Sequence, residues 1–156
     1  DINATLSRNR IKNFVEKLYG YDEDWNELPG VKIDHGTTHI AFSPDFILSN
    51  RFGYAYKGLE VSLQSQYVSK QYMSDIEDHL LDAYFVSNLN LAYTFKLPKL
   101  KSVTIGCTVY NLFNEEYENN GWASSDYTNS PERRNNYTGY AAQAGTNVLG
   151  HLSLSF

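Results

Sequence analysis

Apolar and polar residues alternate with a period of two along several stretches of this chain, and no other feature constrains its fold as much. In residues 84–97 the odd positions are largely apolar and the even positions largely polar. Successive side chains of a β-strand point to opposite faces, so this pattern is typical of a strand with unlike surroundings on its two sides. The alternation recurs in residues 46–56, 59–72, 102–109 and 148–156, and more weakly in residues 11–21. No stretch keeps a helical period, so the sequence predicts an all-β fold of about six antiparallel, up-and-down strands.

The connections between these strands alternate between short and long. Lys57-Gly58 and the segment 97–100 are short enough for tight turns, and long connections cover about residues 22–37, 73–83 and 114–145. In an up-and-down sheet this order puts every short turn at one end and every long loop at the other, as in outer-membrane barrels. A strand of about eleven residues tilted by about 45° also covers roughly 25 Å of depth, which is the height of the apolar band of such barrels.

The aromatic residues support this interpretation but do not settle it. The chain has 13 Tyr, 8 Phe and 2 Trp, and many of them fall near the expected strand ends, where amphipathic rings favour the level of the lipid headgroups. Period-two alternation also occurs in soluble β-sandwiches, in which the same rings would fill a core. A soluble or surface β-sandwich binding module, such as one for carbohydrate, is therefore the alternative that the pattern leaves open.

A short motif gives the chain a resemblance to a known family. Residues 108–117 resemble the penultimate barrel strand of TonB-dependent outer-membrane receptors, and residues 144–156 are similar to the final strand of that family. Gly150 departs from the family pattern, because it lies one residue out of phase with the usual assembly signal. The motif residues that carry the resemblance are Asn111, Leu112, Phe113, Asn114, Tyr117 and Phe156.

The resemblance implies that residues 1–156 are the C-terminal segment of a receptor barrel, with the plug domain and the earlier strands absent. About six strands are also too few to close a membrane barrel, which takes eight or more. The implied complete protein lies in the outer membrane of a Gram-negative bacterium, in contact with its lipid. It would bind a ferric siderophore, haem or a similar scarce nutrient and import it with energy coupled through the TonB complex.

The last long connection is the expected ligand contact. Aromatic rings beside arginines suit an anionic, planar iron chelate through stacking and charge-assisted hydrogen bonds. They also suit stacking on sugars, and a polar loop that touches no substrate is a third interpretation. The candidate ligand-binding residues are Trp122, Tyr127, Arg133, Arg134, Tyr137 and Tyr140.

Other classes of function have little support in the sequence. The net charge of −5 argues against nucleic acid as a partner, and the single cysteine, Cys107, allows no internal disulfide or thiolate-rich metal site. No nucleophile–base motif or phosphate-binding loop occurs, so we expect no enzyme and no cofactor. His35 and His39, and the acidic loop around His79, are better explained as solvated residues than as metal ligands.

Overall fold

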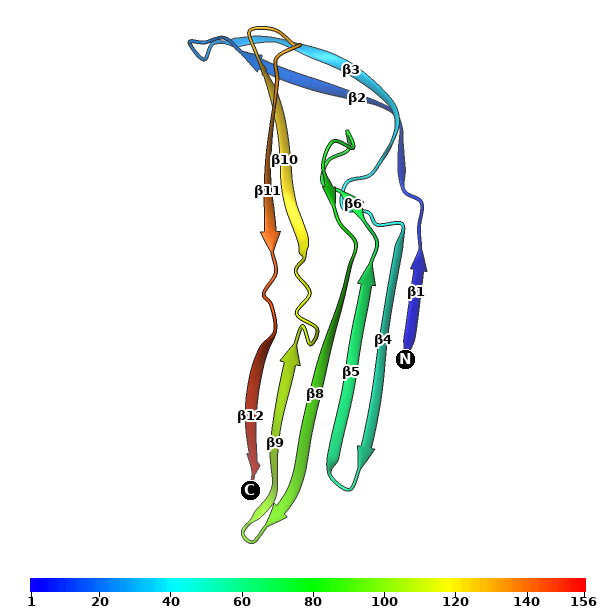
Figure 1. Ribbon diagram of the computed structural model, residues 1–156, viewed down its shortest axis with the longest axis vertical. Coiled ribbons are helices and arrows are strands. Elements are labelled where there is room, and N and C mark those ends of the chain that lie inside the picture. The colour runs from blue at the N-terminus through cyan, green and yellow to red at the C-terminus, as the bar shows by residue number, and fades with distance from the viewer.

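The computed structural model describes residues 1–156 and contains strands and turns but no helix, which confirms the all-β prediction. No helix in it could therefore cross a membrane. The main sheet has six antiparallel strands, in the order β1-β4-β5-β8-β9-β12 (Figure 1). Their bounds are Ile2–Leu6 for β1, Phe46–Tyr56 for β4, Leu59–Val68 for β5, Tyr84–Leu97 for β8, Leu100–Tyr110 for β9 and Asn147–Ser155 for β12.

The long connections are built largely of further strands, which the sequence did not predict. A second sheet has the order β11-β10-β2-β3, and Figure 1 shows it beyond the upper ends of the main strands. A two-stranded ribbon, β6 with β7, lies in the connection from β5 to β8. The bounds are Arg10–Tyr21 for β2, Glu27–His39 for β3, Gln71–Tyr72 for β6, Leu80–Leu81 for β7, Glu118–Thr128 for β10 and Arg134–Ala142 for β11.

Residues 11–21, which showed the weakest alternation, do form a strand, but this strand belongs to the second sheet and not to the main sheet. They form most of β2, and β2 pairs with β3 and β10 rather than joining the main sheet. Their expected position at the edge is taken by Ile2–Leu6, which pairs with β4. The difference has a physical cause, because the irregular register of β2 against β3 breaks the clean alternation that marks a main-sheet strand.

The strand register gathers apolar side chains on one face of the main sheet. One row across it joins Tyr54, Val61, Leu91 and Cys107. Nothing covers this face: Ile105 is 54% exposed, and only 11 of the 156 residues of the chain are buried. The chain therefore lacks the central core that a soluble domain of this length would have.

Both short connections lie at the same end of the main sheet, as expected (Figure 1). Lys57 and Gly58 have φ of 48° and 87°, as in the two-residue turns that fit the twist of a hairpin. A Cβ on Gly58 would lie 2.2 Å from the carbonyl oxygen of Thr94, so this position requires glycine. The other turn places Pro98 before Lys99, which has φ of 80°.

Candidate functional site

The candidate ligand residues lie on the β10–β11 hairpin and divide between its two faces. The register pairs Tyr127 with Arg134 and Gly121 with Tyr140 on one face. Trp122 and Tyr137 belong to the opposite face, where Trp122 lies against Gly139. Arg133 precedes β11 and is exposed. The hairpin therefore does not bring the six residues together into one site.

Tyr127 is a structural residue of this hairpin. Its side chain is only 3% exposed, and its hydroxyl donates a hydrogen bond of 2.5 Å to the carbonyl oxygen of Pro29. Its ring lies over Gly20, where an added Cβ would come within 2.2 Å of the ring. Tyr127 thus holds the β10–β11 hairpin against the β2–β3 hairpin and is closed to an external ligand.

Arg134 joins the same two hairpins through its charge. Its guanidinium donates two hydrogen bonds to the Glu16 carboxylate, at 3.0 and 2.8 Å, and a third to the hydroxyl of Ser125. His35 approaches the same carboxylate at 2.8 Å. Burial alone would raise the pKa of Glu16, but the hydrogen bonds from Arg134 and His35 hold it below the ordinary glutamate value. Because Glu16 occupies its guanidinium, Arg134 is not available to an anionic ligand.

Glu16→Gln should loosen the contact between the two hairpins in a pH-dependent way. A carboxyl group whose folded pKa is lowered stabilises the fold above its unfolded pKa and loses that effect as the pH falls through the folded pKa. Amide exchange in β2 and β10 should therefore be faster in the variant than in the parent near pH 7, and the difference should shrink below about pH 4. Hydrogen exchange of the full-length protein, compared with the parent at each pH, measures this. A difference that is constant with pH would contradict the ionic role of Glu16.

Four of the six candidate residues remain open to a ligand. Trp122, Tyr137 and Tyr140 are exposed aromatic residues, and Arg133 forms no ion pair or side-chain hydrogen bond within the chain, unlike Arg134. Sequence reasoning could not separate these four from Tyr127 and Arg134. The partners of those two, Pro29 and Glu16, lie 98 and 118 residues away along the chain.

The Asn-Leu-Phe-Asn motif forms a turn around the buried Asn111, between the end of β9 and the starts of β10 and β12. Asn111 is buried and has φ of 48°. Its amide nitrogen donates to the carbonyl oxygens of Glu115 and Ala144, and its amide oxygen accepts from the backbone N–H of Glu115. Its own backbone N–H donates to the side chain of Asn88 in β8. The motif thus fixes where β9 ends and where β10 and β12 begin.

The other motif residues have different environments. The Leu112 N–H donates to the carbonyl oxygen of Ser87, whereas Phe113 is exposed. The Asn114 side chain accepts from the N–H of Thr146, and Tyr117 stacks on Tyr84 with ring centroids 4.4 Å apart. Phe156 follows β12 and is 79% exposed. None of these contacts forms a reactive site.

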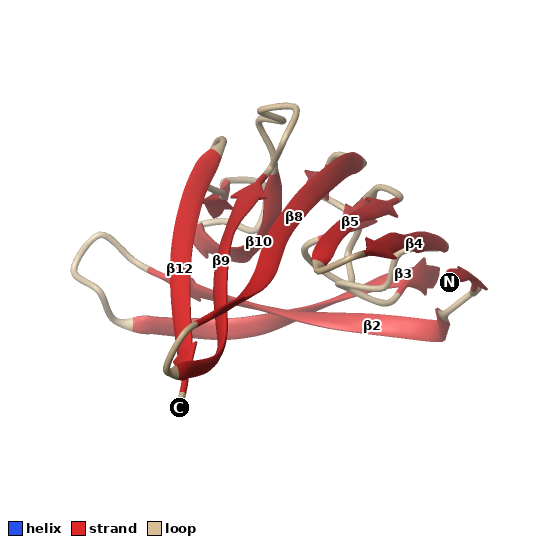
Figure 2. Ribbon diagram, turned by 90° about the horizontal axis from the view of Figure 1, so that it is seen from below, coloured by secondary structure: helices blue, strands red, loops and turns tan.

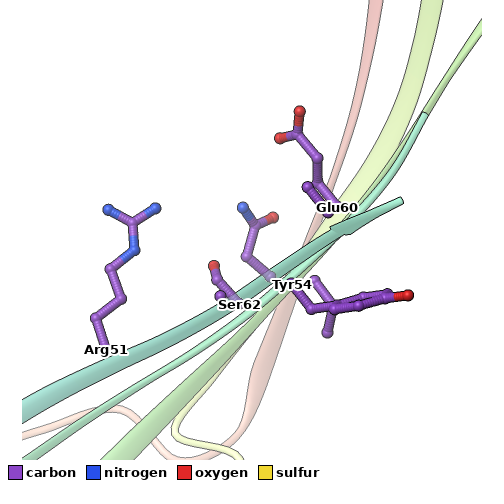
Figure 3. A pocket seen from close by; sticks show the side chains of 8 residues that line it. Arg51, Tyr54, Glu60 and Ser62 are labelled. Atoms are coloured by element: carbon purple, nitrogen blue, oxygen red, sulfur yellow. The ribbon is translucent and has the colours of Figure 1, made fainter. Parts of the chain in front are cut away.

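The polar face of the main sheet carries a hollow of about 220 Å³. Figure 3 shows Arg51, Glu60 and Ser62 on one side of the strands and Tyr54 on the other. Arg51 and Glu60 make no side-chain hydrogen bond or ion pair, so both charges are open to solvent or a partner. Gln64 lines an adjoining hollow on the same face, as the alternation predicts. Lys70 lies beyond the end of β5, beside another hollow.

Three of the four histidines, His35, His39 and His79, lie beside carboxylates. The His39 ring nitrogen lies 2.5 Å from Glu77, and His79 lies 3.3 Å from Asp78. In the acidic loop, Asp75 accepts a hydrogen bond from the N–H of Ala41. These contacts anchor the loop to the end of β3, and no group of three or more histidine, cysteine or acidic residues is placed to hold a metal ion.

The fold defines a class of protein, in which an antiparallel sheet has one apolar and one polar face and is extended at one end by long hairpins. A crystal structure of BauA, the ferric preacinetobactin receptor from Acinetobacter baumannii, has a similar fold, with a TM-score of 0.54 at 17% identity. The similarity covers 82% of this chain and 19% of the receptor, so the chain spans about a fifth of that length. No family model matches the chain. No curated protein matches it either.

Proposed function

We propose that this chain is part of the barrel wall of a TonB-dependent receptor in the outer membrane of a Gram-negative bacterium. The complete protein would bind a ferric siderophore, haem or a similar scarce nutrient and import it. One observation carries the proposal: the main sheet has an uncovered apolar face opposite a polar face. A strand with lipid on one side and a hydrated lumen on the other requires this arrangement.

The edges of the main sheet support the same proposal. β1 and β12 are its outer strands, and neither pairs with a further strand. Unpaired backbone groups in hydrocarbon cost several kcal/mol each, so a sheet in a membrane must close into a barrel. The remaining strands of the barrel would pair with β1 and β12. A segment of a barrel wall is expected to match only part of a complete receptor, and this chain matches about a fifth of BauA.

The alternative, a soluble β-sandwich, has less support. A sandwich needs a second sheet packed face to face on the apolar side of the first. Here the second sheet continues from the ends of the main strands, and its longest hairpin crosses beyond them (Figures 1 and 2). Leu152, on the apolar side, remains 65% exposed.

In the proposed receptor, Arg133 is the basic residue of the last hairpin that would meet an anionic chelate. Arg133→Gln should weaken binding of such a ligand about three- to tenfold, because it removes one charge-assisted hydrogen bond at an exposed position. The measurement is the dissociation constant of the full-length protein by fluorescence quenching. Arg134→Gln should not be combined with it, because that substitution also breaks the ion pair between Arg134 and Glu16. An unchanged constant in Arg133→Gln would favour a loop that does not touch the ligand.

The growth of a strain that lacks the receptor tests the function directly. With iron supplied only as a ferric siderophore or only as haem, or with cobalamin or a glycan as the limiting nutrient, the strain should fail on one source and recover with the full-length gene. Loss of TonB should abolish the same growth. Equal growth of deleted and complemented strains on every source would contradict a transport function.

A further inference from the structure

The tips of the two long hairpins line an open hollow of about 200 Å³ that the proposed transport function does not use. One wall comes from the turn after β2 and the other from β10 and β11. The tips are held together by the short parallel pairing of β2 with β10. Asn129 adds two hydrogen bonds of 3.0 Å, from its N–H to the carbonyl oxygen of Tyr21 and from its side chain to Glu23. The walls are therefore fixed by contacts within the protein.

Three aromatic residues, Tyr21, Trp25 and Tyr137, line this hollow. The rings of Tyr21 and Trp25 are 6.1 Å apart between centroids, at an angle of 49°. Trp25 is 79% exposed, so it contributes little to any core. Its φ of 63° is in the left-handed region, which is unfavourable for a bulky side chain. Folding alone does not account for a tryptophan at this position.

The charged residues of the hollow all have one sign. Asp22, Glu23 and Asp126 line it, and no lysine, arginine or histidine does. Their hydrogen-bond donors are all neutral. Asp22 accepts from the side chain and the backbone N–H of Asn26. Glu23 accepts from the side chain of Asn129, and Asp126 from the side chain of Asn135. The hydrogen bond from the Asn26 side chain lowers the pKa of Asp22. None of the three negative charges is neutralised within the chain.

We propose that the hollow between the hairpin tips binds an organic ammonium cation. Aromatic faces attract a cation through their ring quadrupoles, and quaternary ammonium groups are bound by such aromatic sites. Carboxylates beside the rings add charge attraction and repel anions. The hollow therefore favours a cation, whereas Arg133 favours an anionic ligand. This proposal does not rest on the proposed transport function.

Calorimetric titration of the full-length protein with choline tests the proposal, using 3,3-dimethylbutan-1-ol as an uncharged compound of the same shape. Choline should bind at least tenfold more tightly than the alcohol. Trp25→Ala should abolish binding, and Asp126→Asn should weaken it three- to tenfold. Trp25→Phe should restore part of the affinity, which separates the loss of a ring from a change in folding.

Two matched controls localise the site. Trp122→Ala removes an exposed tryptophan outside the hollow, and Asp24→Asn removes a carboxylate next to Glu23 that does not line it. Both should leave choline binding unchanged. Equal binding of choline and the alcohol, binding of a neutral sugar in place of choline, or no binding of choline would each overturn the proposal. A protein that binds choline but supports growth on no nutrient would contradict only the transport function.

Discussion

In the proposed receptor, Leu91→Arg should prevent the full-length protein from assembling in the outer membrane. Leu91 lies in the middle of β8, in the apolar row with Tyr54 and Val61. An arginine on the lipid face near the middle of a bilayer costs roughly 2–4 kcal/mol. This is a large part of a net folding stability of about 5–15 kcal/mol.

Asn90→Arg is the matched control, because Asn90 directly precedes Leu91 in the same strand and lies on the polar face. It introduces the same side chain into hydrated space and should leave assembly nearly intact. Folded protein in the outer membrane is measured by the difference in gel mobility between heated and unheated samples. Ile105→Arg repeats the test in the neighbouring strand. Equal loss in Leu91→Arg and Asn90→Arg would show that the two faces are assigned wrongly.

Asn111→Ala should destabilise the protein by roughly 3–5 kcal/mol. The substitution leaves the carbonyl oxygens of Glu115 and Ala144 and the N–H of Glu115 without their partner. A buried polar group without a partner costs about 1–3 kcal/mol. The left-handed backbone at this position adds about 1 kcal/mol for alanine. Urea unfolding of the full-length protein gives the change in free energy.

Two further substitutions separate these contributions. Asn111→Gly accepts a positive φ but still lacks the amide group, so it should recover only the backbone contribution. Asn114 also has a positive φ, of 55°, so Asn114→Ala carries the same backbone cost but removes only one exposed hydrogen bond, to the N–H of Thr146. It should therefore cost less than Asn111→Ala. Similar losses for Asn111→Ala and Asn114→Ala would contradict a central role for Asn111.

The main sheet could be predicted from the sequence because its strands face two different environments. Residues 84–97 show the alternation clearly, and the structure places β8 there. The turns at Lys57-Gly58 and Pro98-Lys99 were recognisable from their residue types. In each case the local sequence determines the local structure.

Three strands of the second sheet, β3, β10 and β11, were not predicted because they lack that contrast between two faces. Residues 118–128, which form β10, are largely polar on both faces, so no hydrophobic period identifies them as a strand. β3 contains Pro29, Gly30 and Gly36, which in a sequence indicate loops rather than strands. Pairing with neighbouring strands decides the conformation of such segments.

The candidate site was predicted only in part, for a related reason. The sequence put aromatic residues and arginines in the last long connection, and in the structure Trp122, Tyr137 and Tyr140 of this set are exposed. Residue types could not show that Tyr127 and Arg134 already have partners on β2 and β3. Nor could they show that Trp25 and Tyr137 line the same hollow, because that depends on how the two hairpins meet.

The pairing of β2 with β10 also has a consequence for the order of folding. The hairpins β4–β5 and β8–β9 join neighbouring segments, whereas Glu16 and Arg134 are separated by 118 residues. Closing so long a loop costs more chain entropy, so distant contacts form later than local ones. The junction of the two tips is thus among the last parts of the molecule to form, and a bound choline would report on chains that have completed folding.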